Sequence, residues 1–216
     1  ITDENTYDLV SNVGIGDYYV VIGDSINAGY GDDYLADNTS LDGRNHGGGF
    51  APILNDLLTA SKGYPHTVVK EARGGAQTAD GFDWLPTILE RHPYSGYFLI
   101  MFGTNDTLGA LPSGRNKSPG DPGYAGSFKD LMQRMILMIR DAGKEPYLAK
   151  IPYSQFGETV NVGYREYNEV VGELATLNNI KVVPPDFYTH FQQHPEEMID
   201  ALHPNGAGYD SMGSQW

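Results

Sequence analysis

The sequence predicts an α/β fold, with a mainly parallel five-stranded sheet covered by helices on both faces as a three-layer α/β/α sandwich. Five short apolar segments alternate with segments of helical periodicity, which is typical of such a sheet. The 216-residue chain is long enough for one domain with a substantial core. Because no repeat or linker divides it, we expect a single domain over residues 1–216.

The expected strands are short runs rich in apolar and β-branched residues. The last of them stops at Pro184 and Pro185, because proline cannot donate a hydrogen bond to a neighbouring strand. The expected strands cover residues 18–22, 67–69, 97–102, 145–151 and 180–183.

The expected helices are segments in which apolar residues recur three and four positions apart. The clearest carries an apolar face over residues 128–139 and should end near Gly143. Asp83 is expected to cap another helix, with Pro86 still within its first turn. The expected helices cover residues 50–58, 83–91, 128–143 and 167–174 and a segment after Pro204.

The composition excludes several classes of partner. The chain has 14 basic and 28 acidic residues, a net charge of −14. Binding to nucleic acid or to anionic membranes requires basic patches, so neither is expected. No apolar run approaches the roughly 20 residues of a membrane span.

The chain contains no cysteine. This excludes disulfides, a cysteine nucleophile and thiolate metal sites. The chain starts at Ile1 without Met and without a signal peptide. This start is compatible with a processed or trimmed product of secreted origin, and we expect a soluble protein with an extracellular or periplasmic location.

Two long polar stretches, residues 30–49 and 104–126, interrupt the alternation of strands and helices. Each follows the end of a strand, where open α/β sheets bind ligands, so both are expected to shape a site. The first holds four acidic residues that could surround a cation, but their spacing is not that of an EF-hand, which favours a solvated loop. They are Asp32, Asp33, Asp37 and Asp42.

Ser25 is the candidate nucleophile, because it follows a strand directly in the tripeptide Gly-Asp-Ser. Taken alone, a serine at this place is more often structural than catalytic. Near the other end of the chain, Asp200 and His203 provide the acid and base that a serine nucleophile needs. His203 would accept the proton of Ser25, and Asp200 would orient the imidazole.

An ester hydrolase also needs donors for the oxyanion that forms in the transition state. The backbone N–H groups of Ser25 and Gly75 and the side-chain amide of Asn105 are the candidates. One such donor lowers the barrier by roughly 3 kcal/mol in comparable sites. Asp24 and Asp106 adjoin these residues and are expected to support the loops rather than take part in the chemistry.

Residues 46–49, His-Gly-Gly-Gly, suggest the oxyanion loop of α/β-hydrolase lipases. Those enzymes also carry a Gly-x-Ser-x-Gly elbow, and here Asn27 stands where the second glycine should be. The glycines are therefore interpreted as a flexible approach to the helix that follows.

Four blocks together resemble the SGNH hydrolases, the GDSL-type esterase/lipase family. They are Gly-Asp-Ser-Ile at 23–26, Arg-Gly-Gly-Ala-Gln-Thr at 73–78, Gly-Thr-Asn-Asp at 103–106 and Asp-Ala-Leu-His at 200–203. They follow the family order across nearly the whole chain, with Ile26 in place of the usual Leu. In the glycine block, Gly74 and Gly75 compete as donor, and Gly75 fits the family's Gly-x-x-Thr pattern better.

The resemblance implies a flavodoxin-like fold, no metal and no cofactor, and two-step hydrolysis through an acyl-enzyme. We expect a serine esterase that acts on small short-chain acyl or aryl esters. An alternative is an O-acetyl esterase acting on carbohydrate, and a less favoured one is a binding protein that has lost turnover. The sequence does not indicate an oligomeric state.

Overall fold

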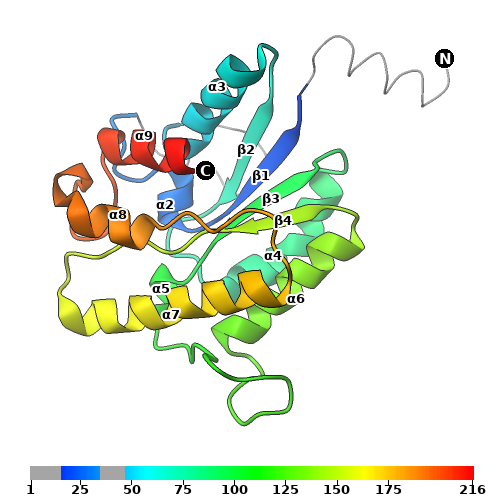
Figure 1. Ribbon diagram of the computed structural model, residues 1–216, viewed down its shortest axis with the longest axis vertical. Helices are drawn as coiled ribbons and strands as arrows, with labels where there is room; N and C mark the ends of the chain where they lie inside the picture. The colour runs from blue at the N-terminus through cyan, green and yellow to red at the C-terminus, as the bar shows by residue number, and fades with distance from the viewer. Residues whose placement is uncertain (1–15, 35–46) are drawn as a thin grey trace.

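The computed structural model describes residues 16–34 and 47–216, which form a sheet between two layers of helices (Figure 1). Within these residues the sheet has four parallel strands in the order β2-β1-β3-β4. The strands are β1 Tyr18–Gly23, β2 Thr67–Ala72, β3 Tyr97–Met101 and β4 Glu145–Leu148.

The inner strands are buried on both faces. Val20 of β1 pairs with Val69 of β2 on one side and with Phe98 of β3 on the other, and all three are buried. Burial on both faces explains why these strands read as continuous apolar runs rather than as alternating patterns. The expected α/β fold with a parallel sheet is thus confirmed.

The segment 180–183 differs from the expectation, because it does not form a fifth strand. Val183 is 87% exposed. Beyond it, the N–H of Lys150 donates to the carbonyl of Pro185 at 3.1 Å, and Lys150 and Asp186 form an isolated parallel bridge. The segment approaches the edge beyond β4, but Pro184 and Pro185 have no N–H to continue a ladder.

The helices cover both faces of the sheet. The chain steps from β1 to β2 in one direction and from β2 to β3 in the other, so right-handed crossovers place α3 and α4 on opposite faces. In Figure 1, α3 and α9 lie above the strands, and α6 and α7 lie below them. The helices are α2 Ser25–Ala28, α3 Phe50–Lys62, α4 Thr78–Arg91, α5 Thr104–Leu108, α6 Phe128–Asp141, α7 Glu158–Leu177, α8 Phe187–Gln193, the 3₁₀ turn η1 Pro195–Glu197, and α9 Gly206–Gln215.

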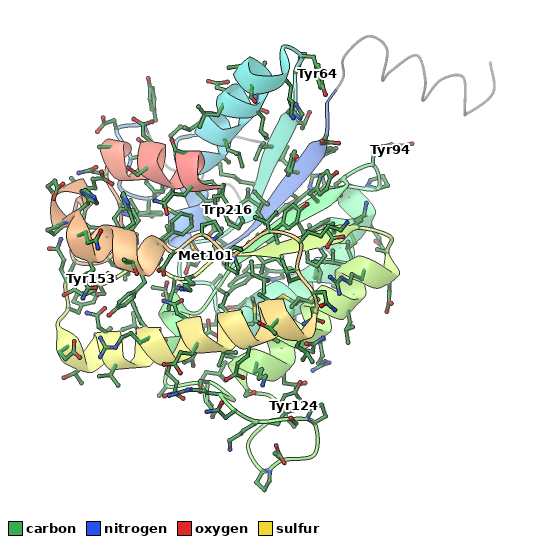
Figure 2. All side chains as sticks on the ribbon, in the orientation of Figure 1. Tyr64, Tyr94, Met101, Tyr124, Tyr153 and Trp216 are labelled. Atoms are coloured by element: carbon green, nitrogen blue, oxygen red, sulfur yellow. The ribbon has the colours of Figure 1, made fainter. Side chains whose placement is uncertain are left out.

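Specific contacts join neighbouring helices in each layer. The side chain of Trp216, at the end of α9, stacks on Phe50 of α3 with ring centroids 6.0 Å apart, and Figure 2 shows it between α9 and the strands. In the opposite layer, the guanidinium of Arg134 in α6 lies 4.0 Å from the ring centroid of Phe82 in α4.

Among the described helices, none has the length and apolar character needed to cross a bilayer.

Helix α4 begins five residues before the expected cap at Asp83. Gln77 is its N-cap, and the carboxylate of Asp80 accepts a hydrogen bond from the backbone N–H of Gln77 at 2.8 Å. Pro86 therefore lies inside the helix rather than in its first turn. The helix tolerates it because buried apolar residues on the same helix, including Leu85 and Ile88, hold it to the sheet.

Three of the predicted site residues follow the carboxyl ends of strands in the sheet. Ser25 follows β1, Gly75 follows β2, and Asn105 follows β3. Because these strands are parallel, their carboxyl ends meet at the same edge, which is where ligands bind in open α/β sheets.

Candidate active site

Ser25 is the first residue of the short helix α2, directly after β1. Strand and helix meet tightly here: a Cβ on Gly23 would overlap the side chain of Asn27 and lie 2.5 Å from the carbonyl oxygen of Met101. Asp24 caps the helix, since its Oδ1 accepts the N–H of Ile26 at 3.0 Å. Ser25 is only 6% exposed, and these contacts hold the turn that carries its hydroxyl.

Ser25, His203 and Asp200 form a hydrogen-bonded chain. The Oγ of Ser25 lies 3.0 Å from Nε2 of His203. On the other side of the ring, Nδ1 of His203 lies 2.9 Å from Oδ2 of Asp200. The structure thus brings the three predicted residues together, in the order that a nucleophile, a base and an orienting acid require.

Asp200 also organises its own turn. Its Oδ1 accepts the backbone N–H groups of Leu202 and His203, each at 2.7 Å. Partial burial acts to raise the pKa of Asp200, but the hydrogen bonds to His203 and Leu202 outweigh it, and the pKa is lowered. The carboxylate therefore stays ionised, and the three-residue spacing fixes the imidazole relative to it.

The loop that carries Asp200 and His203 is anchored by the segment between β4 and α7, a contact that the sequence did not reveal. The hydroxyl of Ser154 donates to the carbonyl of Ala201 at 3.0 Å, and the N–H of Gln155 donates to the same oxygen at 2.8 Å. Asn161 of α7 holds Ser154 in turn, donating to its carbonyl at 2.7 Å and accepting its N–H at 3.1 Å. Both Ser154 and Asn161 are fully buried.

Gly75 lies in a turn after β2 that is closed by a hydrogen bond from the N–H of Ala76 to the carbonyl of Arg73 at 3.2 Å. Its φ of +77° is a backbone conformation that favours glycine. Gly74 does not have a positive φ. Both glycines are exposed at the surface, so the turn is open to a substrate.

Asn105 lies in the first turn of α5. Its Nδ2 donates one hydrogen to the carbonyl of Ala76 at 3.0 Å, which ties it to the turn that holds Gly75. Among residues 16–34 and 47–216, the second hydrogen of this amide has no acceptor, so it is available to a substrate. The structure therefore joins two of the predicted oxyanion donors into one unit.

Asp24 and Asp106 are fully buried behind these residues. The carboxylate of Asp106 accepts the N–H of Thr78 with both oxygens, at 2.9 and 3.1 Å, and so links α5 to the start of α4. Burial raises the pKa of Asp106. Burial, reinforced by the nearby charge of Asp106, raises the pKa of Asp24 to about 7, although the hydrogen bond from Ile26 opposes this rise. The hydrogen bonds of both carboxylates fit the supporting role expected for them.

Tyr30, an aromatic residue of the first long polar stretch, borders the candidate site. Its ring lies beside the imidazole of His203, with centroids 5.7 Å apart. A Cβ on Gly74 would lie 3.7 Å from the same ring. The backbone of Tyr30 is held in place, because the hydroxyl of Tyr209 donates to its carbonyl at 2.6 Å. Its ring therefore borders the space between the candidate base and the glycine turn.

A separate cavity of about 600 Å³ lies between the start of α3 and the start of α9. Ser25, His203 and Asp200 do not line it. Asp32 and Asp33 line it together with Asp56 and Asp210. Asp32 has a structural role, since its carboxylate accepts the N–H groups of Asp33 and Gly49. Asp37 and Asp42, the other members of the predicted acidic loop, lie outside the described residues, as does His46.

The family model of the GDSL-like lipase/acylhydrolase family matches residues 21–210, which span all four motif blocks. The chain belongs to this family. The resemblance seen in the motif blocks is thereby confirmed, and membership supports an ester hydrolase. Among the curated proteins, no sequence matches the chain.

Solved structures share the fold of this GDSL-like protein at low sequence identity. A variant of Axe2, an acetyl xylan esterase from Geobacillus stearothermophilus, superposes with a TM-score of 0.72 at 19% identity, over 94% of both chains. A lipase/acylhydrolase from Enterococcus faecalis gives 0.66 at 21% identity, over 92% of both chains. The acetyl xylan esterase AlAXEase gives 0.66 at 18% identity, over 91% of this chain and 96% of its own.

Proposed function

We propose that the protein is a serine esterase that hydrolyses small carboxylic esters through an acyl-enzyme intermediate. The observation that carries the proposal is the hydrogen-bonded chain from Ser25 through His203 to Asp200. A serine hydroxyl is a weak nucleophile unless an adjacent base accepts its proton. The 3.0 Å contact between Ser25 Oγ and His203 Nε2 is within the reach that this transfer needs.

In the first step, Ser25 Oγ attacks the carbonyl carbon of the ester while Nε2 of His203 accepts the hydroxyl proton. The bond to the alcohol oxygen then breaks, and the imidazolium returns the proton to the leaving alcohol. Asp200 stabilises the imidazolium through Nδ1 and holds the ring in the required tautomer. In the second step, water attacks the acyl-enzyme with His203 as base again, and the carboxylic acid leaves.

The oxyanion of each tetrahedral intermediate would be bound by the N–H of Ser25, the N–H of Gly75 and the second amide hydrogen of Asn105. The link between Asn105 and Ala76 supports this assignment, since it fixes two of the donors relative to each other before substrate arrives. Donors that are already oriented stabilise developing charge without reorganisation, which is the largest single contribution in many such sites.

The surroundings of Ser25 leave room for a large alcohol group. The turn with Gly74 and Gly75 is exposed, and the Asp200 side chain is 55% exposed. A site this close to the surface can admit an ester on a bulky polar molecule. An O-acetyl group on a carbohydrate is therefore the second candidate substrate, and the shared fold with two acetyl xylan esterases supports it.

Hydrolysis of p-nitrophenyl acetate, butyrate, octanoate and palmitate, compared with acetate release from acetylated xylooligosaccharides, tests the proposal. We expect kcat/KM to be highest for the acetate or butyrate and to fall for the longer chains. Higher kcat/KM on the oligosaccharides than on the acetate would favour the carbohydrate esterase. Saturable binding of acetylated sugar with no hydrolysis of any ester would instead indicate a member that has lost turnover.

A further inference from the structure

Two imidazoles and two carboxylates gather where α8 meets η1, outside the candidate active site. One nitrogen of His194 and one carboxylate oxygen each from Glu196 and Glu197 lie within 4.8 Å of one another. His190 adjoins them, since its Nε2 lies 2.7 Å from Oε2 of Glu197. The rings of His190 and His194 stack, with centroids 4.7 Å apart.

The charge in this cluster is poorly balanced. Residues 186–216 contain no lysine and no arginine. Within the described part of the chain, the ion-pair partner of Glu196 is His194, and that of Glu197 is His190. Neither carboxylate has a lysine or arginine partner among the described residues, so a divalent cation would supply the charge that the surrounding sequence lacks.

We propose that His194, Glu196 and Glu197 form a zinc-type divalent cation site, with His190 as the fourth ligand. Imidazole nitrogen together with carboxylate oxygen suits Zn²⁺, whereas Ca²⁺ and Mg²⁺ prefer all-oxygen sites. Ligand atoms around tetrahedral Zn²⁺ lie roughly 3.4 Å apart, so the separations within the cluster must shorten by at most about 1.4 Å. The side chains of His194 and Glu196 are 45% and 70% exposed and free to rotate that far.

A cation at this place would act on the loop that carries Asp200 and His203. The carbonyls of Glu196 and Glu197 accept hydrogen bonds from Nδ2 and the backbone N–H of Asn205, each at 2.8 Å. These bonds close the base of the loop that contains Asp200 and His203. The ion would brace that base and would take no part in the hydrolysis, so the site stands independently of the proposed function.

Isothermal titration of chelator-treated protein with ZnCl₂ tests the site. We expect saturable binding of one ion, weakened by at least about tenfold in His194→Ala and in Glu197→Gln, as even the loss of partners outside the ligand set typically costs that much. Glu169→Gln removes an exposed carboxylate elsewhere and should bind as the wild type does. Zn²⁺ should also raise the Tm of the wild type but not that of His194→Ala.

His203→Ala separates this site from zinc binding at the candidate active site. The proposal requires that His203→Ala binds Zn²⁺ as the wild type does. It would be overturned by absence of saturable binding, by loss of binding in His203→Ala but not in His194→Ala, or by equal affinity for Ca²⁺. The Tm of each variant without metal shows whether it is folded. If His194→Ala is unstable, Glu197→Gln takes its place in the test, because glutamine has the shape of glutamate and can still form hydrogen bonds.

Discussion

His203 Nε2 lies 3.0 Å from Ser25 Oγ, although 178 positions separate the two residues in the sequence. The contact depends on the carboxyl end of β1, which fixes Ser25, and on the anchored loop, which fixes His203. The loop is closed by its own backbone, since the N–H of Ile199 donates to the carbonyl of His203 at 2.9 Å. Both partners are therefore held in place before any substrate binds.

Replacement of Asp200 by Asn tests the orienting acid. The amide keeps an oxygen for the backbone N–H groups of Leu202 and His203, so the turn should persist with an unchanged Tm. The negative charge is lost, and kcat should fall by as much as about 10⁴ with little change in KM. Steady-state kinetics on p-nitrophenyl acetate measure this. A kcat within twofold of the wild type would remove Asp200 from the mechanism.

Replacement of Asn105 by Ala tests the side-chain oxyanion donor. We expect kcat to fall by roughly 10²–10³ at nearly constant KM, because the donor acts mainly on the transition state. The same change removes the bond to Ala76, so the Tm should be recorded in parallel. A loss of stability with full kcat would show that Asn105 only holds the turn.

Gly75 and Gly74 are compared by replacing each with Ala. No atom lies within 4 Å of a Cβ on Gly75, so the cost comes from its positive φ and should be about 1 kcal/mol of the free energy of unfolding. A Cβ on Gly74 meets only ordinary contact with Tyr30, and the change should be nearly neutral. Gly75→Ala should also lower kcat, because strain moves the donor N–H. A larger kcat loss in Gly74→Ala would reassign the donor.

Asp24 makes stability depend on pH. With its pKa raised to about 7 from 3.8, the folded protein holds a proton that the unfolded chain has already released between these values. The folded state then binds more protons, so this group lowers the free energy of unfolding as pH rises through that window. Asp24→Asn removes the effect and keeps an acceptor for Ile26.

Urea unfolding of Asp24→Asn and the wild type at about pH 5 and about pH 8 measures this dependence. The variant should gain stability relative to the wild type as pH rises, whereas Asp141→Asn, at an exposed position, should follow the wild type. A gain that is independent of pH, or that shrinks as pH rises, would contradict a raised pKa at Asp24.

The parallel sheet was predictable because its strands are buried on both faces and read as apolar runs. The run at 180–183 is also rich in β-branched residues, yet Val183 is exposed and the following prolines have no N–H to donate at the edge beyond β4. The start of α4 was also predicted too late, because the prediction relied on apolar periodicity. Its first turn is set by Gln77 and Asp80, whereas the periodicity begins further along the helix.

The site residues were predictable because each lies in a short block with distinctive composition. Their supports were not, because they depend on tertiary contacts. Ser154 holds the loop by donating to the carbonyl of Ala201. Every residue has a backbone carbonyl, so the sequence does not indicate which one accepts this bond. Asn161 is a fully buried polar residue on the inner face of α7, and that position is the signal that could have identified it.

We propose that Ser25 forms the acyl-enzyme, and the Ser25→Ala variant is the decisive test of this role. The measurement is the mass of the protein after treatment with a p-nitrophenyl phosphonate, together with the initial rate on p-nitrophenyl acetate. The wild type should gain one covalent phosphonyl group on Ser25 and lose activity. Ser25→Ala should gain none, keep the wild-type Tm, and turn over slower by at least about 10⁴. Labelling of the wild type at another residue, or activity of Ser25→Ala near that of the wild type, would contradict the account.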